Sequence, residues 1–157
     1  MGIVLARIDQ RLVHGIVVTQ WTSAVNAQRI MVIDDEVAVD EPRKAAMRMS
    51  KPAGTGMSLI DTETAVNNFK SGRYDNHNVL LVVNNVDILL KLLDEGIDIP
   101  KVNVGIMLDS DERQKYTSHF AATDEELHKL KEIETRGTPV TIQFAPSDKE
   151  EPLNNFI

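Results

Sequence analysis

One carboxylate, two guanidinium groups and one imidazole occur within residues 7–14, whose sequence is Arg-Ile-Asp-Gln-Arg-Leu-Val-His. The neutral imidazole of His14 is a nucleophile that can form a covalent phosphoryl intermediate. Arg11 offers a planar, permanently charged donor for phosphate oxygens, and Asp9 could orient the imidazole or fix the loop. Because phosphoryl transfer depends mainly on positioning and charge stabilisation, the segment predicts a site that makes and breaks a phosphohistidine. The competing interpretation is an unreactive loop in which His14 is a helix cap or a surface residue.

The backbone that follows His14 could contribute to the same site. Apolar residues recur at helical spacing over residues 14–27, so a helix is predicted to begin at or just after His14. The N–H groups of its first turn, including those of Gly15 and Ile16, lack intrahelical partners and lie at the positive end of the helix dipole. They are therefore expected to bind phosphate oxygens together with Arg11.

Strand-like and helix-like segments alternate along the whole chain. Strands are predicted over residues 3–8, 29–33, 57–60, 78–83, 101–107 and 139–145. Helices are predicted over residues 14–27, 41–49, 61–69 and 86–93, and from the capping box of Thr123 and Glu126 to Gly137. Continuous apolar strands favour a mostly parallel sheet with helices on both faces, an open doubly wound three-layer α/β sandwich. Residues 116–121 are a candidate extra strand, an antiparallel edge strand could be added, and residues 1–157 are expected to form a single domain.

Function in such sheets lies at the carboxyl ends of the strands, where two further charged groups occur. Residues 34–36, Asp-Asp-Glu, could bind Mg²⁺, or Asp35 could hold the first loop through Arg7 or Arg11. The hydrogen-bonding role is the favoured one. A basic group in the helix over 41–49 and just beyond it could dock an acidic partner or form an exposed helix face; its members are Arg43, Lys44, Arg48 and Lys51.

Composition excludes several classes of function. The 157 residues carry 17 basic and 24 acidic side chains, a net charge of −7, so a general nucleic-acid-binding surface is not expected. There is no cysteine, and no histidine pair has metal-ligand spacing, so neither a metal site nor a cofactor is expected. The glycine signatures of dinucleotide and P-loop sites are also missing. No apolar run approaches the length of a membrane span, and a cytoplasmic location is expected.

Residues 6–15, Ala-Arg-Ile-Asp-Gln-Arg-Leu-Val-His-Gly, closely resemble the active-site loop of one protein family. It comprises the mannose/sorbose-family enzyme IIB components of the bacterial phosphoenolpyruvate:sugar phosphotransferase system. The resemblance continues in order over nearly the whole chain, through residues 19–21, 33–38, 43–44 and 101–107.

The resemblance implies a protein-Nπ-phosphohistidine–sugar phosphotransferase with a mostly parallel sheet between helices. Its phosphorylated histidine falls on His14, its phosphate-binding arginine on Arg11, and its two acidic positions on Asp9 and Asp35. The phosphoryl donor would be an enzyme IIA component. The acceptor would be a sugar bound by the membrane partners IIC and IID, with this chain at the cytoplasmic side of that permease. Mannose, fructose, sorbose and N-acetylgalactosamine are all candidate sugars, and the oligomeric state stays open.

Two positions depart from the family pattern. Ile16 stands where glutamine is common, and Ile106 stands where glycine or asparagine follows the position of Gly105. Neither departure touches Arg11 or His14, so the reaction type is expected to be kept, whereas the sugar specificity stays open. Arg7 and Gly105 are expected to be supporting residues.

Three other classes of function remain as alternatives. A receiver-like signalling domain would place its acidic pair after the first strand, whereas Asp34 and Asp35 follow the second. A small-ligand binding module without turnover is compatible with the fold class, as is a purely structural interaction domain.

Overall fold

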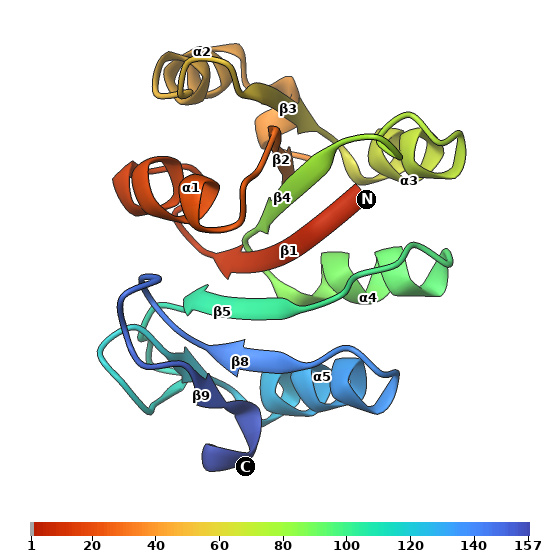
Figure 1. Ribbon diagram of the computed structural model, residues 1–157. Coiled ribbons are helices and arrows are strands. Elements are labelled where there is room, and N and C mark those ends of the chain that lie inside the picture. Colours follow the sequence, from red (N-terminus) through yellow and green to blue (C-terminus); the bar gives the residue numbers. More distant parts are fainter. Residues whose placement is uncertain (1) are drawn as a thin grey trace.

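The computed structural model describes residues 2–157, which form a seven-stranded sheet with helices on both faces (Figure 1). The strand order is β3-β2-β4-β1-β5-β8-β9, all parallel except β9, which runs antiparallel to β8 at one edge. The strands are β1 (Gly2–Asp9), β2 (Arg29–Ile33), β3 (Gly56–Ile60), β4 (Asn78–Val83), β5 (Val102–Ile106), β8 (Val140–Ile142) and β9 (Glu151–Pro152). The predicted mostly parallel α/β sandwich with an antiparallel edge strand is confirmed.

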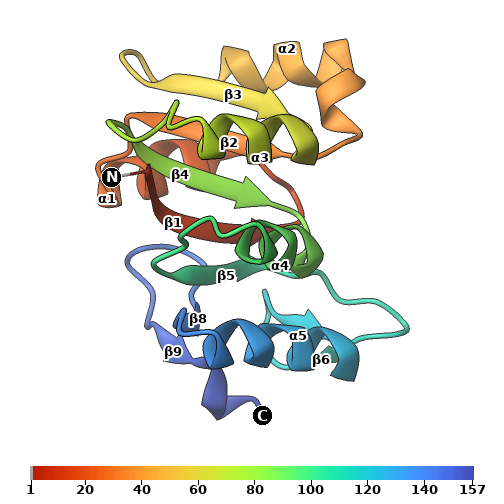
Figure 2. The same cartoon turned by 90° about the vertical axis from the view of Figure 1, so that its right-hand side faces the viewer.

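The helices divide between the two faces of the sheet. The π-helix η1 (Val17–Trp21), α1 (Thr22–Ala24) and α2 (Glu41–Met49) lie on one face. The opposite face carries α3 (Thr62–Lys70), α4 (Val86–Asp94) and α5 (Asp124–Thr135), which stand in front in Figure 2. Short 3₁₀ turns η2 (Val37–Val39) and η3 (Leu153–Asn155) complete the helical elements of the described residues. None of the helices within residues 2–157 is both long and apolar enough to cross a bilayer.

Strand β1 lies at the centre of the sheet, between β4 and β5. The chain passes from β1 to β2 on one side and crosses to the other side only after β4, so the winding reverses around β1. Ligands of doubly wound sheets bind at the carboxyl ends of the strands where this reversal occurs. A ligand-binding or catalytic site is therefore expected at the carboxyl end of β1, at Asp9.

Side chains of β1 alternate between the two layers of core. Ala6 and Ile8 pack into the cluster under α3, α4 and α5, whereas Leu5 packs into the cluster with η1. Because successive strand residues face opposite sides, Arg7 and Asp9 lie on the Leu5 side. The register pairs Arg7 with Asn103 of β5, so two polar side chains share this buried face.

Most predicted helix starts are confirmed by their caps. Asp40, Asp61 and Asn85 each accept a hydrogen bond from a first-turn N–H, and Thr123 forms the predicted capping box with Glu126. These residues cap because a short side-chain oxygen satisfies an N–H that has no helical partner.

Two segments differ from their predictions. The helix expected over residues 14–27 ends at Ala24 and contains the five-residue π-helix η1. Residues 116–121 do not form one strand. Residues 116–120 form a turn, in which the N–H groups of Tyr116 and Thr117 both donate to the carbonyl of Phe120, and only Ala121 belongs to a strand. The turn joins two short antiparallel strands, β6 (Gln114–Lys115) and β7 (Ala121–Ala122).

Candidate functional site

His14 lies against the buried carboxylate of Asp9 at the end of β1. Its Nε2 is 2.7 Å from Oδ2 of Asp9, whose side chain is fully buried, whereas the His14 side chain is 22% exposed. An ionised carboxylate only accepts hydrogen bonds, so Nε2 carries the proton. The lone pair of the neutral ring is then on Nδ1, the atom left for nucleophilic attack.

Asp9 also organises the loop that contains His14. Its Oδ1 accepts from the backbone N–H of Arg11 at 2.9 Å, and its carbonyl accepts from the N–H of Leu12 at 2.9 Å. Leu12 has a φ of 57°, a left-handed conformation that turns the chain back toward Asp9. One carboxylate thus contacts both the imidazole and the loop, the two alternatives that the sequence left open.

Arg7 supplies the positive charge beside Asp9. Its Nε donates to Oδ2 of Asp9 at 3.1 Å, and both side chains are fully buried. Its Nη1 donates to Oδ1 of Asn103 at 2.8 Å and to the carbonyl of Phe144 at 2.9 Å. Burial lowers the pKa of the Arg7 guanidinium, and the Asp9 carboxylate opposes that shift. The pair fixes Asp9 because breaking a buried ion pair is strongly unfavourable.

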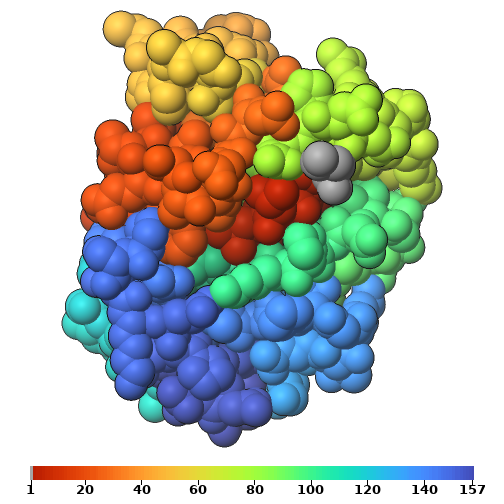
Figure 3. All heavy atoms as spheres, in the orientation of Figure 1, coloured from red at the N-terminus to blue at the C-terminus, as the bar shows by residue number. Residues whose placement is uncertain are grey.

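The residues that contact the guanidinium of Arg7 leave just enough space for it. The guanidinium lies 5.2 Å from the centre of the Trp21 ring, and the Trp21 Nε1 donates to the same Phe144 carbonyl at 2.9 Å. On its other side is Gly105, where an added Cβ would lie 2.1 Å from Cζ of Arg7. Figure 3 shows the C-terminal segment beside the segment that follows β1 on this face, as these contacts require.

The predicted phosphate-binding groups lie at the open side of the loop. Arg11 and Gly15 are exposed, and Ile16 is half-buried. The first helical hydrogen bond runs from the N–H of Val18 to the carbonyl of His14 at 3.0 Å, so the N–H groups of Gly15 and Ile16 precede the helical ladder. Their role toward phosphate stays a prediction.

Asp35 has the favoured hydrogen-bonding role but a different partner, because it forms no hydrogen bond with Arg7 or Arg11. Its Oδ1 accepts from the N–H and the hydroxyl of Thr62, at 2.9 and 3.2 Å, and so links the end of β2 to the start of α3. The reason is the strand order, because β4 separates β2 from β1. Strands β2 and β1 are therefore two strand spacings apart, roughly 10 Å.

A second anchor of the loop was not predicted. Oε1 of Gln10 accepts from the N–H of Leu108 and from Nη1 of Arg113. Arg113 in turn binds Glu126 through two hydrogen bonds, Nε to Oε1 at 2.9 Å and Nη2 to Oε2 at 2.7 Å. Burial acts to raise the pKa of Glu126, but the bonds from Arg113 and Thr123 outweigh it and hold that pKa below its ordinary value.

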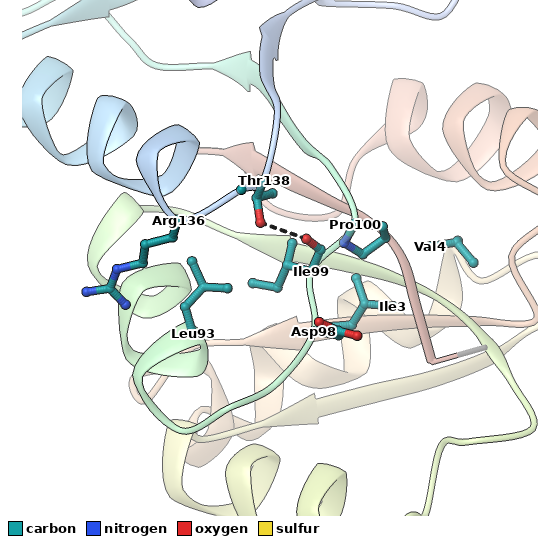
Figure 4. Close-up of a pocket in the computed structure, with 9 residues that line it drawn as sticks. Ile3, Val4, Leu93, Asp98, Ile99, Pro100, Arg136 and Thr138 are labelled. Carbon is teal, nitrogen blue, oxygen red and sulfur yellow. Dashed lines mark hydrogen bonds between the residues drawn. The ribbon is translucent and has the colours of Figure 1, made fainter.

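A cavity of about 650 Å³ lies away from these residues, around the turns that lead into β5 and β8 (Figure 4). Thr138 and Ile99 are joined there by a 2.9 Å hydrogen bond, and Arg136 pairs with Asp94 and Glu132 outside it. Its lining contains no member of the His14 cluster. Within residues 2–157 no group of three or more His, Cys, Asp or Glu side chains could hold a metal ion.

Comparisons with known proteins identify what the chain resembles. The family model described as "PTS system sorbose subfamily IIB component" matches residues 3–157. The N-acetylgalactosamine-specific phosphotransferase enzyme IIB component 1 of Escherichia coli is 35% identical over 154 residues, 97% of this chain and 96% of that protein. The E. coli mannose-specific EIIAB component is 29% identical over 157 residues, all of this chain and 49% of that protein. Among solved structures, the IIB domain of the Klebsiella pneumoniae sorbose permease superposes with a TM-score of 0.92 at 28% identity, covering 100% of this chain and 99% of that one.

Proposed function

The chain belongs to the sorbose subfamily of phosphotransferase-system IIB components, and from that membership we propose that His14 is its phosphoryl carrier. In this proposal a IIA component phosphorylates His14, and the phosphoryl group then passes to a sugar bound by the membrane components IIC and IID. The observation that carries the proposal is the 2.7 Å contact between Nε2 of His14 and the buried Asp9.

That contact selects the reacting atom. With its proton on Nε2, His14 attacks phosphorus through the Nδ1 lone pair, forming an N–P bond while the N–P bond of the donor histidine breaks and the donor ring keeps the electron pair. The His14 ring gains positive charge in this step, and the Asp9 carboxylate stabilises it at hydrogen-bond distance. In the second step a sugar hydroxyl oxygen attacks phosphorus, the Nδ1–P bond breaks, and the hydroxyl proton passes to a base on the permease side.

Arg11 and the N–H groups of Gly15 and Ile16 bind the phosphoryl oxygens in both steps. Arg11 is exposed, so it can meet an incoming group without displacing a protein contact. The intermediate must be discharged as well as formed, so these groups favour the transition state over a deeply bound phosphohistidine. An open loop suits a carrier that two partners approach in turn, and no cofactor is needed.

The names of the relatives indicate the chemical class of the sugar but not which sugar it is. Those named above are described as specific for N-acetylgalactosamine, mannose and sorbose, so the acceptor is a hexose or an amino sugar. The chain acts as one IIB domain at the cytoplasmic face of the membrane, where the permease presents the sugar.

The test is phosphorylation by phosphoenolpyruvate, enzyme I, HPr and a IIA component, followed by intact mass. We expect one acid-labile, base-stable phosphate that is absent from His14→Ala, and NMR should place it on Nδ1. A label that survives His14→Ala, or no label with any competent donor, refutes the carrier. An acid-stable, Mg²⁺-dependent label would instead indicate a receiver-like acyl phosphate.

A further inference from the structure

The outer face of α2 is apolar. Pro42, Ala45, Ala46 and Met49 follow one another at the spacing of a single helix face, and all four are exposed. Met49 is 88% exposed, and Val39, in the turn before the helix, is 81% exposed. These are the two most exposed large hydrophobic side chains of the described residues. An amphipathic helix normally turns this face to the core, so α2 has the reverse orientation.

Only the narrow inner side of α2 is held by the body of the protein. No residue of the helix is fully buried, and Met47 packs against the core cluster that also receives Val13 and Ile16 of the His14 loop. Arg48 donates to the carbonyl of Met57 at 3.1 Å, and Lys44 donates to that of Ala38 at 3.2 Å. Figure 3 shows α2 projecting at one end of the molecule, with its outer side uncovered.

The charge around this face is opposite to that of the whole chain. Residues 39–51 contain four basic and two acidic side chains, a net charge of +2, in a chain whose net charge is −7. Arg43 and Lys51 are exposed. The exposed charges beside the apolar strip are therefore three basic side chains, Arg43, Arg48 and Lys51, and one acidic side chain, Glu41. A strip with this predominantly basic border is complementary to an apolar patch bordered by acidic side chains.

The same face lies on the side of the molecule where His14 reacts. The turn η2 and the start of α2 follow the carboxyl end of β2, and β2 is two strands from β1. The two strands are roughly 10 Å apart, and an interface of ordinary size is wider than that, so a protein docked over His14 at this edge would extend toward Val39 and Arg43.

Resting on the proposed function, we propose that the outer face of α2 is the docking surface for the phosphoryl donor, a protein with an acidic border around its own reactive histidine. A second copy of this chain is the less suitable occupant, because pairing two such faces would juxtapose their basic borders. Cytoplasmic loops of a permease are commonly rich in Lys and Arg and would be repelled. A bilayer is also disfavoured, because residues 39–51 contain no Trp, Phe or Leu to insert and the chain as a whole is acidic.

The experiment measures phosphoryl transfer from a purified IIA component that phosphorylates the wild-type chain, over a range of donor concentrations. In the double variant Arg43→Glu, Met49→Gln we expect the KM for the donor to rise by about tenfold or more, because one basic and one apolar side chain of the docking surface are removed together. The maximal rate should stay within about twofold of wild type, since α2 does not contact His14. Added salt should raise the wild-type KM more than that of the variant.

The matched control is Arg73→Glu, Ile157→Gln, which makes the same changes at exposed positions of other elements. Arg43→Gln serves if the double variant unfolds, with a smaller rise in KM expected. An unchanged donor KM in both α2 variants, while the wild type is phosphorylated, refutes the docking surface and leaves the proposed function intact. Failure of every donor to phosphorylate His14 refutes the proposed function and this inference together. Sedimentation with anionic vesicles, or dimerisation, that depends on Met49 and Arg43 with no change in donor KM would assign the face to a membrane or to a second copy and overturn the proposal.

Discussion

Gly105→Ala is expected to disable the site without touching His14. The backbone at Gly105 does not have a positive φ, so alanine is tolerated there by the main chain. The new methyl carbon, however, would lie 2.1 Å from Cζ of Arg7 and 2.2 Å from its Nη1. Ordinary contact begins at 3.4 Å, so the guanidinium must move by at least about 1.3 Å.

The guanidinium of Arg7 cannot move that far without losing hydrogen bonds. Nη1 holds Asn103 at 2.8 Å and the Phe144 carbonyl at 2.9 Å, and Nε holds Asp9 at 3.1 Å. A buried charge deprived of its partners costs about 3–5 kcal/mol of unfolding free energy. Misplacing Asp9 by about 1 Å should also slow phosphoryl transfer on the order of 10²-fold.

The measurement is urea unfolding together with the transfer rate at saturating donor. Gly56→Ala is the matched control, because its Cβ would also meet an arginine, with Cζ of Arg29 at 2.8 Å. The guanidinium of Arg29 is the far end of a flexible, half-buried side chain and can move aside. We therefore expect Gly56→Ala to lose less than about 1 kcal/mol of unfolding free energy. Equal stability losses in the two variants, or a Gly105→Ala protein that transfers phosphoryl groups at the wild-type rate, would refute the positioning role of Arg7.

Three further predictions concern the groups around His14. In Asp9→Asn a single amide oxygen would have to accept from the three donors that now bind the two carboxylate oxygens. The variant should therefore lose about 3–5 kcal/mol of unfolding free energy. It should also free the Nε2 proton to move to Nδ1 and slow transfer by about 10³-fold or more, and an NMR spectrum with the His14 tautomer unchanged would contradict this. Arg113→Ala removes the side chain that anchors Gln10 and should slow phosphoryl transfer by about tenfold. Arg113→Lys should restore only part of the rate, because lysine cannot form two parallel hydrogen bonds with Glu126. Full rescue by lysine would argue against a positioning role for Arg113. Because the folded pKa of Glu126 is lowered, its stabilisation is present above the ordinary value of 4.5 and is lost as the pH falls through the lowered one. Urea unfolding of Glu126→Gln should therefore show a weaker loss of stability below about pH 4.5 than the wild type, and parallel curves would show that Glu126 contributes nothing there.

The contacts of Asp9 with His14 and with the backbone of Arg11 were predictable because the three residues are neighbours in the sequence. Asp9, Arg11 and His14 lie within six positions, and a helix start after a buried strand is readable from periodicity alone. The strand order is not readable in this way. Asp35 was assigned to the wrong partner because a pattern of strands does not state that β4 lies between β2 and β1.

The supporting residues illustrate the same limit at the level of single side chains. Asn103 carried a signal, since a polar residue inside the apolar run Val-Asn-Val must find a buried partner. Arg113 carried none, because an arginine in an exposed irregular segment is ordinary. Phe144 contributes only its carbonyl, and a backbone oxygen has no sequence signature at all.

The central position of β1 has a consequence for biosynthesis. This strand precedes the others in the chain, yet its neighbours begin only at Asn78 and Val102, and the carbonyl that holds Arg7 belongs to Phe144. During synthesis the surroundings that align Asp9 with His14 are therefore complete only after almost every other strand has been made. A nascent or proteolytically shortened chain that lacks residues 143–144 contains Asp9 and His14 but not the Phe144 carbonyl that holds Arg7 beside them. Such fragments would expose unpaired apolar strands, the kind of surface that chaperones bind.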